Sequence, residues 1–146
     1  MTDTPILNGQ VIGQAERATR AVLDALLAET DIDFLQWVTV NVLDAAGRSI
    51  DEADLVQRVA AGLKVEGSTA LGALDDIVAS GFAARDLTSA GRVDLTPAGV
   101  ALHDRVSAGI GRITERLYRD LPVDDLATAG RVLTLVTARA NAELAG

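Results

Sequence analysis

Apolar residues recur with a helical period along most of the chain. From Asp51 to Leu63 they fall three and four positions apart, and the stretch Ser68–Gly81 repeats that spacing after a short break at Lys64–Gly67. Such spacing gathers the apolar side chains of each segment on one face. The sequence therefore predicts two amphipathic helices joined by a tight turn, with Ser68 and Thr69 as the N-cap pair of the second.

The pattern changes after this second helix. Phe82–Ala84 and Arg92–Leu95 are short enough for strands, and a polar turn, Asp86–Gly91, separates them. Thr96 and Pro97 then open another helix, because a proline at the first helical position lacks only an N–H that would have no partner there. The order helix, turn, helix, hairpin and helix is typical of a winged helix-turn-helix, which places its second helix in a DNA groove.

Long helical segments flank this module on both sides. In all, the sequence predicts one hairpin and helices at about 6–28, 34–43, 51–63, 68–81, 97–120 and 123–144. The second of these is apolar nearly all round and is expected to be central, with Asp31 or Asp33 as its cap. The last helix carries an apolar stripe that includes Leu126, Leu133 and Val136. We expect this stripe to pack against another subunit; the alternative is that it folds back on its own core.

Two motifs are the most specific parts of this module: "STALGALDDIVASGF" (Ser68–Phe82) and "VDLTPAG" (Val93–Gly99). They resemble the MarR family of bacterial winged-helix regulators. The resemblance implies a mainly α fold with a small β-hairpin, a winged helix-turn-helix with N- and C-terminal dimerisation helices. It implies a single domain over residues 1–146, with the winged core at about 34–99 and dimerisation helices at about 6–30 and 97–146. Where the family has an Asp-Arg step in the wing, this chain has Arg85-Asp86 and Arg92-Val93-Asp94.

The resemblance also implies a function and partners. The chain is expected to be a homodimeric DNA-binding transcription regulator, modulated by a small aromatic effector. Two-fold symmetry implies that it binds double-stranded DNA at a pseudo-palindromic site. Neither enzymatic activity, a cofactor nor a membrane partner is expected.

Candidate DNA contacts lie at the start of the second module helix and around the wing. Hydroxyl and N–H groups at a helix start suit phosphate contact, and wing arginines can enter a minor groove. The alternatives are simple N-capping by the hydroxyls and pairing of the two wing arginines with Asp86 and Asp94. The candidate residues are Lys64, Ser68, Thr69, Ala70, Gly72, Ala73, Arg85, Thr88, Ser89 and Arg92.

A ligand pocket is expected beside the second helix, in keeping with the resemblance. Its candidate residues are Phe34, Trp37, Asn41 and His103. The alternative, which the scarcity of aromatic side chains in this chain favours, is that Trp37 is a core anchor. His103 is the single histidine, and a catalytic histidine needs a nucleophile and an orienting group beside it. No such constellation is evident, and a single histidine without cysteine makes no usual zinc site.

Charge argues against tight DNA binding. The 146-residue chain has a net charge of −8, and four basic and eight acidic residues lie between Ser49 and Thr96. Lysine and arginine contacts with phosphates supply most non-specific affinity. The alternative function is therefore a winged-helix protein with weak or lost DNA binding, acting as a ligand-sensing or protein-interaction module. Without cysteine there are no disulfides, and without a signal peptide or spanning segment we expect a cytoplasmic protein.

Overall fold

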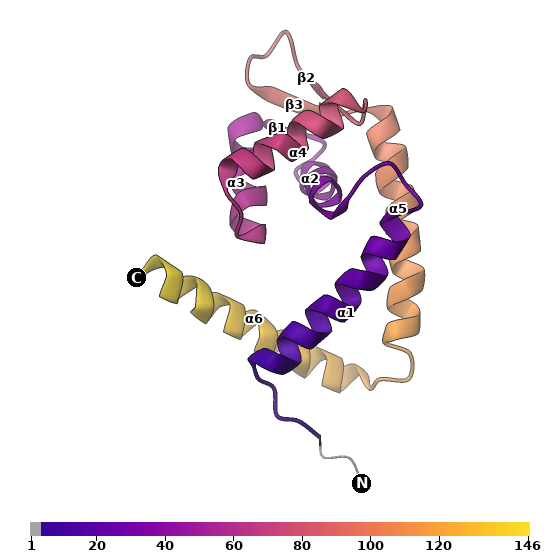
Figure 1. Ribbon diagram of the computed structural model, residues 1–146, viewed down its shortest axis with the longest axis vertical. Helices are drawn as coiled ribbons and strands as arrows, with labels where there is room; N and C mark the ends of the chain where they lie inside the picture. Colours follow the sequence, from indigo (N-terminus) through magenta and orange to yellow (C-terminus); the bar gives the residue numbers. More distant parts are fainter. Residues whose placement is uncertain (1–3) are drawn as a thin grey trace. The chain divides into compact units, whose positions relative to one another are not determined.

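The computed structural model describes residues 4–146. They form two compact units, one extending to Ile110 and the other Gly111–Gly146. The described chain contains the six predicted helices and the predicted hairpin, which confirms the fold class (Figure 1). The helices are α1 (Gly9–Leu27), α2 (Phe34–Ala45), α3 (Glu52–Leu63), α4 (Gly67–Ala79), α5 (Pro97–Leu117) and α6 (Val123–Ala145).

The strands are β1 (Ser49–Asp51), β2 (Ala83–Arg85) and β3 (Arg92–Leu95). They form an antiparallel sheet in the order β1-β3-β2, and β2 and β3 are the wing hairpin. The sequence did not indicate β1, because three residues between two helices are too few to show alternation. Ile50 of β1 lies opposite Val93 of β3, and both side chains are buried. The first unit is thus closed at this edge by a third strand.

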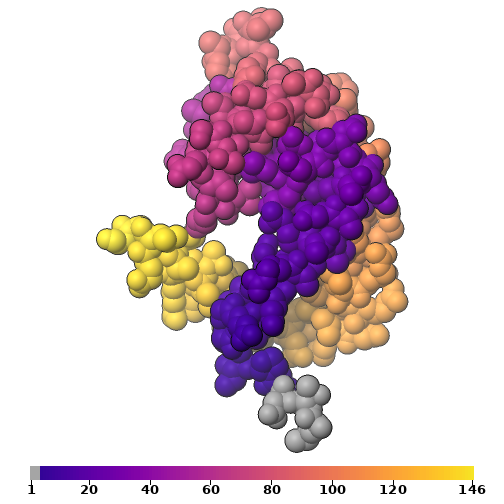
Figure 2. Space-filling model, viewed as in Figure 1, coloured from indigo at the N-terminus to yellow at the C-terminus, as the bar shows by residue number. Residues whose placement is uncertain are grey.

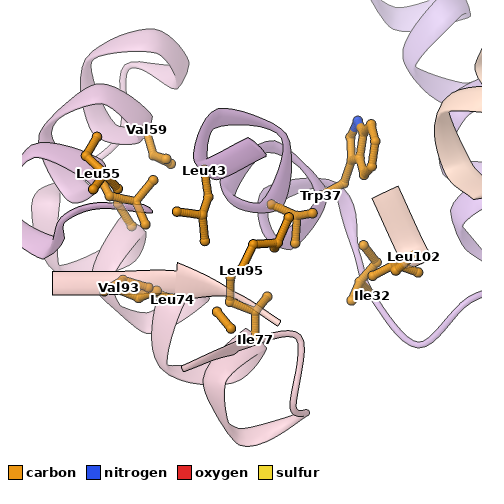
Figure 3. Close-up of a cluster of buried hydrophobic side chains, with 14 of the residues drawn as sticks. Ile32, Trp37, Leu43, Leu55, Val59, Leu74, Ile77, Val93, Leu95 and Leu102 are labelled. Carbon is orange, nitrogen blue, oxygen red and sulfur yellow. The ribbon is translucent and has the colours of Figure 1, made fainter. Parts of the chain in front are cut away.

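The core of the first unit is built around α2, as its apolar sequence predicts. Leu43 lies at the centre of a cluster with side chains from α3, α4 and the sheet (Figure 3). In Figure 1, α4 lies between α2 and the wing hairpin, and it contacts both. Trp37, Ile32 and Leu102 extend the core toward α5. This packing fixes which face of α4 remains outside.

Side-chain hydrogen bonds cap three of the six helices in the described chain, α1, α2 and α5. Asp33 caps α2 in a reciprocal box with Gln36, which confirms one of the two expected caps. Thr96 Oγ1 accepts a hydrogen bond from the Gly99 N–H at 3.1 Å, so Thr96 caps α5 as expected. The expected cap of α4 is wrong. Its N-cap is Glu66, which makes no side-chain cap bond, and Ser68 lies inside the first turn.

Two glycines allow α5 to pack closely within the first unit. A Cβ on Gly99 would collide with the carbonyl oxygen of Phe82 and would lie 2.7 Å from Leu95 Cδ1. A Cβ on Gly109 would lie 2.9 Å from Leu26 Cδ1 of α1. Both glycines are buried in α5. The start of α5 is therefore held against β3 and the segment that joins α4 to β2, and its middle against α1.

The second unit contains the end of α5 and the whole of α6. No residue of α6 is buried in the described chain. Its exposed apolar side chains include Leu133, Leu135, Val136 and Leu144. None of the helices in residues 4–146 is long and apolar enough to cross a membrane.

Candidate nucleic-acid interface

The start of α4 is exposed and carries small polar residues. Gly67, Ser68, Thr69 and Gly72 are all exposed. Because Glu66 provides no side-chain cap, the first N–H groups of the helix have no side-chain acceptor. The Ser68 and Thr69 hydroxyls make no hydrogen bond within residues 4–146. Free N–H and hydroxyl groups at the positive end of a helix suit contact with a phosphate.

Two of the expected contact residues on α4 are misplaced. Ala70 and Ala73 are only 1% and 4% exposed, because they share the buried face of α4 with Leu74 and Ile77. Their side chains cannot reach DNA. The outward positions are instead Leu71, which is 39% exposed, and the exposed Asp75 and Asp76. The helical period of the buried residues was the signal that could have found them.

The wing loop is ordered by its own polar residues. Asp86 Oδ1 accepts hydrogen bonds from the Thr88 hydroxyl at 2.7 Å, the Thr88 N–H at 2.8 Å and the Ser89 N–H at 3.3 Å. These hydrogen bonds, above all that of the Thr88 hydroxyl, lower the pKa of Asp86. Thr88 and Ser89 are exposed at the tip, and Figure 2 shows the loop projecting beyond the surface over α4. The loop is thus presented in a defined conformation.

Arg92 lies at the base of the wing and pairs with β1. It stands directly opposite Asp51 in the sheet, and its Nη1 lies 3.2 Å from Asp51 Oδ1. Its Nη2 donates to Ser49 Oγ at 3.0 Å. The expected partner Asp94 is wrong, because Arg92 and Asp94 lie on the same strand, whereas the unrecognised strand β1 supplies a carboxylate across the ladder.

Arg85 is the last residue of β2, on the other side of the wing loop from Arg92, and it lies between two acidic residues. Its Nε donates to Glu52 Oε1 of α3 at 2.6 Å, and its Nη2 donates to Asp75 Oδ1 of α4 at 2.6 Å. These hydrogen bonds, first with Asp75 and then with Glu52, raise the pKa of Arg85. The expected partner Asp86 is wrong, since its carboxylate accepts from the wing loop instead. We call the group of Arg85, Glu52 and Asp75 the carboxylate clamp.

Lys64 lies in the turn between α3 and α4. It adopts a left-handed conformation with φ of 57°, which ends α3. The side chain is exposed, and its Nζ donates to the Ala61 carbonyl at 2.9 Å. Between Ser68 and Gly81 the sequence has no basic residue, so the cations near the exposed face of α4 come from the turn and the wing.

The four expected pocket residues do not line one cavity. Trp37 stacks on His103 with ring centres 5.3 Å apart, and His103 Nε2 lies 3.0 Å from Asn41 Oδ1. Trp37 is buried and belongs to the core. Phe34 lies elsewhere, with the Arg20 guanidinium 3.4 Å above its ring, and lines a hollow of about 630 Å³.

That hollow lies between the end of α1, the start of α2 and the end of α3. Its apolar lining includes Leu27, Ile32, Leu35, Leu63 and Val65. Arg20 and Asp24 add charge to it. No group of three or more His, Asp or Glu side chains within residues 4–146 is arranged to hold a metal ion.

No protein-family model matches the sequence, and no curated protein shows significant similarity to it. Solved structures do match. The reduced form of MarR from E. coli is 24% identical with a TM-score of 0.71, over 91% of this chain and 95% of that chain.

Two further structures show the same similarity. A complex of S. aureus MepR with DNA is 17% identical with a TM-score of 0.74, over 91% of this chain and 96% of that chain. A MarR-family transcriptional regulator from a Rhodococcus species is 15% identical with a TM-score of 0.73, over 88% of this chain and 90% of that chain. The chain therefore has the winged-helix fold of MarR regulators.

Proposed function

We propose that this chain, which has the fold of MarR regulators, is a dimeric DNA-binding transcription regulator. The observation that carries the proposal is the exposed start of α4 beside an ordered wing, in a fold shared with a protein solved in complex with DNA. Gly67, Ser68, Thr69 and Gly72 are small exposed residues that a DNA backbone can approach, and Ser68 and Thr69 add their hydroxyl groups. In a dimer, two such surfaces would bind a pseudo-palindromic site.

Dimerisation is supported by the exposed apolar side chains of α6. Monomeric proteins rarely leave long apolar stripes in water, because burying them is favourable by about 25 cal/mol per Å². Leu133, Val136 and Leu144 all lie on a helix without a buried residue in the described chain. A second copy of the chain is the partner that this surface suits best, through the terminal helices.

A small aromatic effector is the regulatory ligand in this proposal. The hollow beside Phe34 is supported as its site by an apolar lining, an aromatic ring and the Arg20 guanidinium. Trp37 lies on the same helix, α2, and is the single tryptophan. An effector that binds here should change Trp37 emission together with DNA affinity. A ligand that changes DNA affinity and leaves the emission unchanged would place the effector site elsewhere.

The decisive experiment is a titration of the purified protein with the DNA upstream of its own gene, at low and rising salt. We expect the protein to retard the DNA in a gel at low salt. The logarithm of the affinity should fall with the logarithm of the salt concentration, with a slope of roughly 0.9 per phosphate contact. Ser68→Ala should weaken binding without lowering the melting temperature, because Ser68 caps no helix. Ser80→Ala, at the opposite end of α4, is the matched control and should change neither.

The alternative function is a ligand-sensing or protein-interaction module with weak or lost DNA binding. Two observations favour it: exposed Asp75 and Asp76 on α4, and the pairing of both wing arginines with carboxylates of their own chain. A folded dimer that fails to retard any DNA at low salt would establish this alternative over the regulator.

A further inference from the structure

In the carboxylate clamp, Arg85 of the wing pairs with carboxylates of both α3 and α4. Arg85 extends from the end of β2, Glu52 from the first residue of α3, and Asp75 from the middle of α4. Two of the three guanidinium nitrogens are engaged at 2.6 Å, each with a different helix. All three side chains remain partly open to solvent, with exposed fractions between 32% and 57%. A competing anion can therefore reach the arginine.

Resting on the proposed function, we propose that Glu52 and Asp75 set the DNA affinity of this protein by competing with a DNA phosphate for Arg85. A phosphate and a carboxylate can each accept two parallel hydrogen bonds from the same guanidinium donors. While Glu52 and Asp75 hold Arg85, they neutralise its positive charge. The three side chains together then carry a net negative charge on the side that would face DNA. Release of Arg85 supplies one further phosphate contact in each subunit.

The neighbouring Asp76 is a matched comparison for Asp75, because it carries the same charge on the same helix but contacts Gln36 and not Arg85. Asp76 follows Asp75 on α4 and is also exposed to solvent, but its carboxylate accepts a hydrogen bond from Gln36 Nε2 at 3.2 Å. It makes no ion pair with Arg85 within the described residues. Removing the charge of Asp76 changes the net charge of α4 as much as removing that of Asp75, but it leaves Arg85 held. The two aspartates therefore separate the clamp from general electrostatics.

The test compares DNA affinities of wild-type protein, Asp75→Asn, Asp76→Asn and the pair Glu52→Gln with Asp75→Asn, as dimers, over a salt series. At 50 mM salt we expect the double variant (the pair) to bind DNA roughly tenfold or more tightly than wild type. The affinity of Asp75→Asn should lie between these two, and Asp76→Asn should gain less affinity than Asp75→Asn. The salt slope of the pair should steepen by about 1.8, because one phosphate contact is gained in each of two subunits. Adding Arg85→Ala to the pair should remove the steepening.

Three results would overturn the proposal. Equal gains for Asp75→Asn and Asp76→Asn would mean that only net charge matters. Weaker binding by the pair would mean that the clamp positions the wing for DNA. If wild type binds DNA and the double variant binds it with the same affinity, the proposed function stands and the clamp has no role in it. If wild type fails to bind and the pair binds, the clamp is supported and the proposed function of the native chain fails; if neither binds, both fail.

Discussion

The first unit and α6 use apolar residues in opposite ways. In the first unit, Leu43, Leu55 and Leu74 are fully buried by α2, α3, α4 and the sheet. In α6 the apolar side chains are as frequent, but Leu133, Leu135 and Val136 keep 38–46% of their surface exposed. A helix of this length gains most of its stability from packing of its apolar face. The winged module therefore buries its core within one chain, whereas α6 carries a surface suited to a partner.

The largest loss of stability is expected for Leu74→Ala in the core of the first unit. Leu74 is fully buried, so its truncation should lower the free energy of unfolding by about 2–5 kcal/mol. Urea or thermal unfolding measures the loss. Leu71→Ala on the same helix is the control, and because Leu71 is exposed it should cost less than about 1 kcal/mol. Equal losses at the two positions would contradict the assigned core.

The complementary change adds charge to α6. Leu133→Asp combined with Val136→Asp should weaken dimerisation at least about 100-fold, or about 2.8 kcal/mol, because two carboxylates would have to be desolvated in an apolar contact. Sedimentation should show the chain mass of 15.2 kDa at concentrations where wild type shows twice that mass. The near-ultraviolet signal of Trp37 should persist, since Trp37 belongs to the first unit.

The control for that experiment places the same two charges at polar positions. Thr128→Asp combined with Asn141→Asp alters exposed residues of the same helix and should leave the dimer intact. Dissociation by this pair as well would mean that charge alone, and not the apolar stripe, governs assembly. A monomeric wild type at micromolar concentration would remove the dimer from the proposal altogether.

A smaller effect is expected where α5 joins the first unit. Gly99→Ala should cost about 1–3 kcal/mol, because the new methyl group would collide with the Phe82 carbonyl and with Leu95. Thermal unfolding measures it. Gly111→Ala adds a methyl group in open space on the same helix and should be neutral or stabilising by up to about 1 kcal/mol. A tolerated alanine at position 99 would show that the start of α5 is not held as described.

The smallest effect is expected at Gly72 on the exposed face of α4. A Cβ there meets nothing within 4 Å, so Gly72→Ala should stabilise the protein by about 0.5–1 kcal/mol through helix propensity. If DNA approaches the backbone at this position, the same change should weaken DNA binding while the melting temperature rises. A rise in both quantities would show that the DNA backbone does not come close to Gly72.

Much of the fold could be predicted because its signals are local. The spacing of Leu55, Val59 and Leu63 defines a helix without knowledge of the rest of the chain, and Thr96-Pro97 marks a helix start within two residues. The short strand β1 gave no such signal. Without β1, the sequence gives no reason to pair Arg92 with Asp51, because the two residues are 41 positions apart.

The candidate site was less predictable because it depends on contacts between distant segments. Glu52 is 33 residues from Arg85, and no spacing rule connects them. Proximity in sequence favours Asp86 as the partner of Arg85, but the Asp86 carboxylate accepts hydrogen bonds from the wing loop instead. Ala70 and Ala73 were placed in the interface by their position along α4 alone, although its helical period assigns them to the core.

The attachment of α5 has a mechanical consequence. Thr96 Oγ1 donates to the Gly81 carbonyl at 2.6 Å and the Thr96 N–H donates to the Phe82 carbonyl at 3.1 Å, directly beyond the end of α4. Further along, α5 packs against Leu26 of α1 at Gly109, so its part from Pro97 to Gly109, about 20 Å of helix, is fixed at both ends within the first unit. A rotation of α5 about Thr96 would have to break the contact at Gly109. This part of α5 is therefore expected to move together with the winged module as one rigid rod.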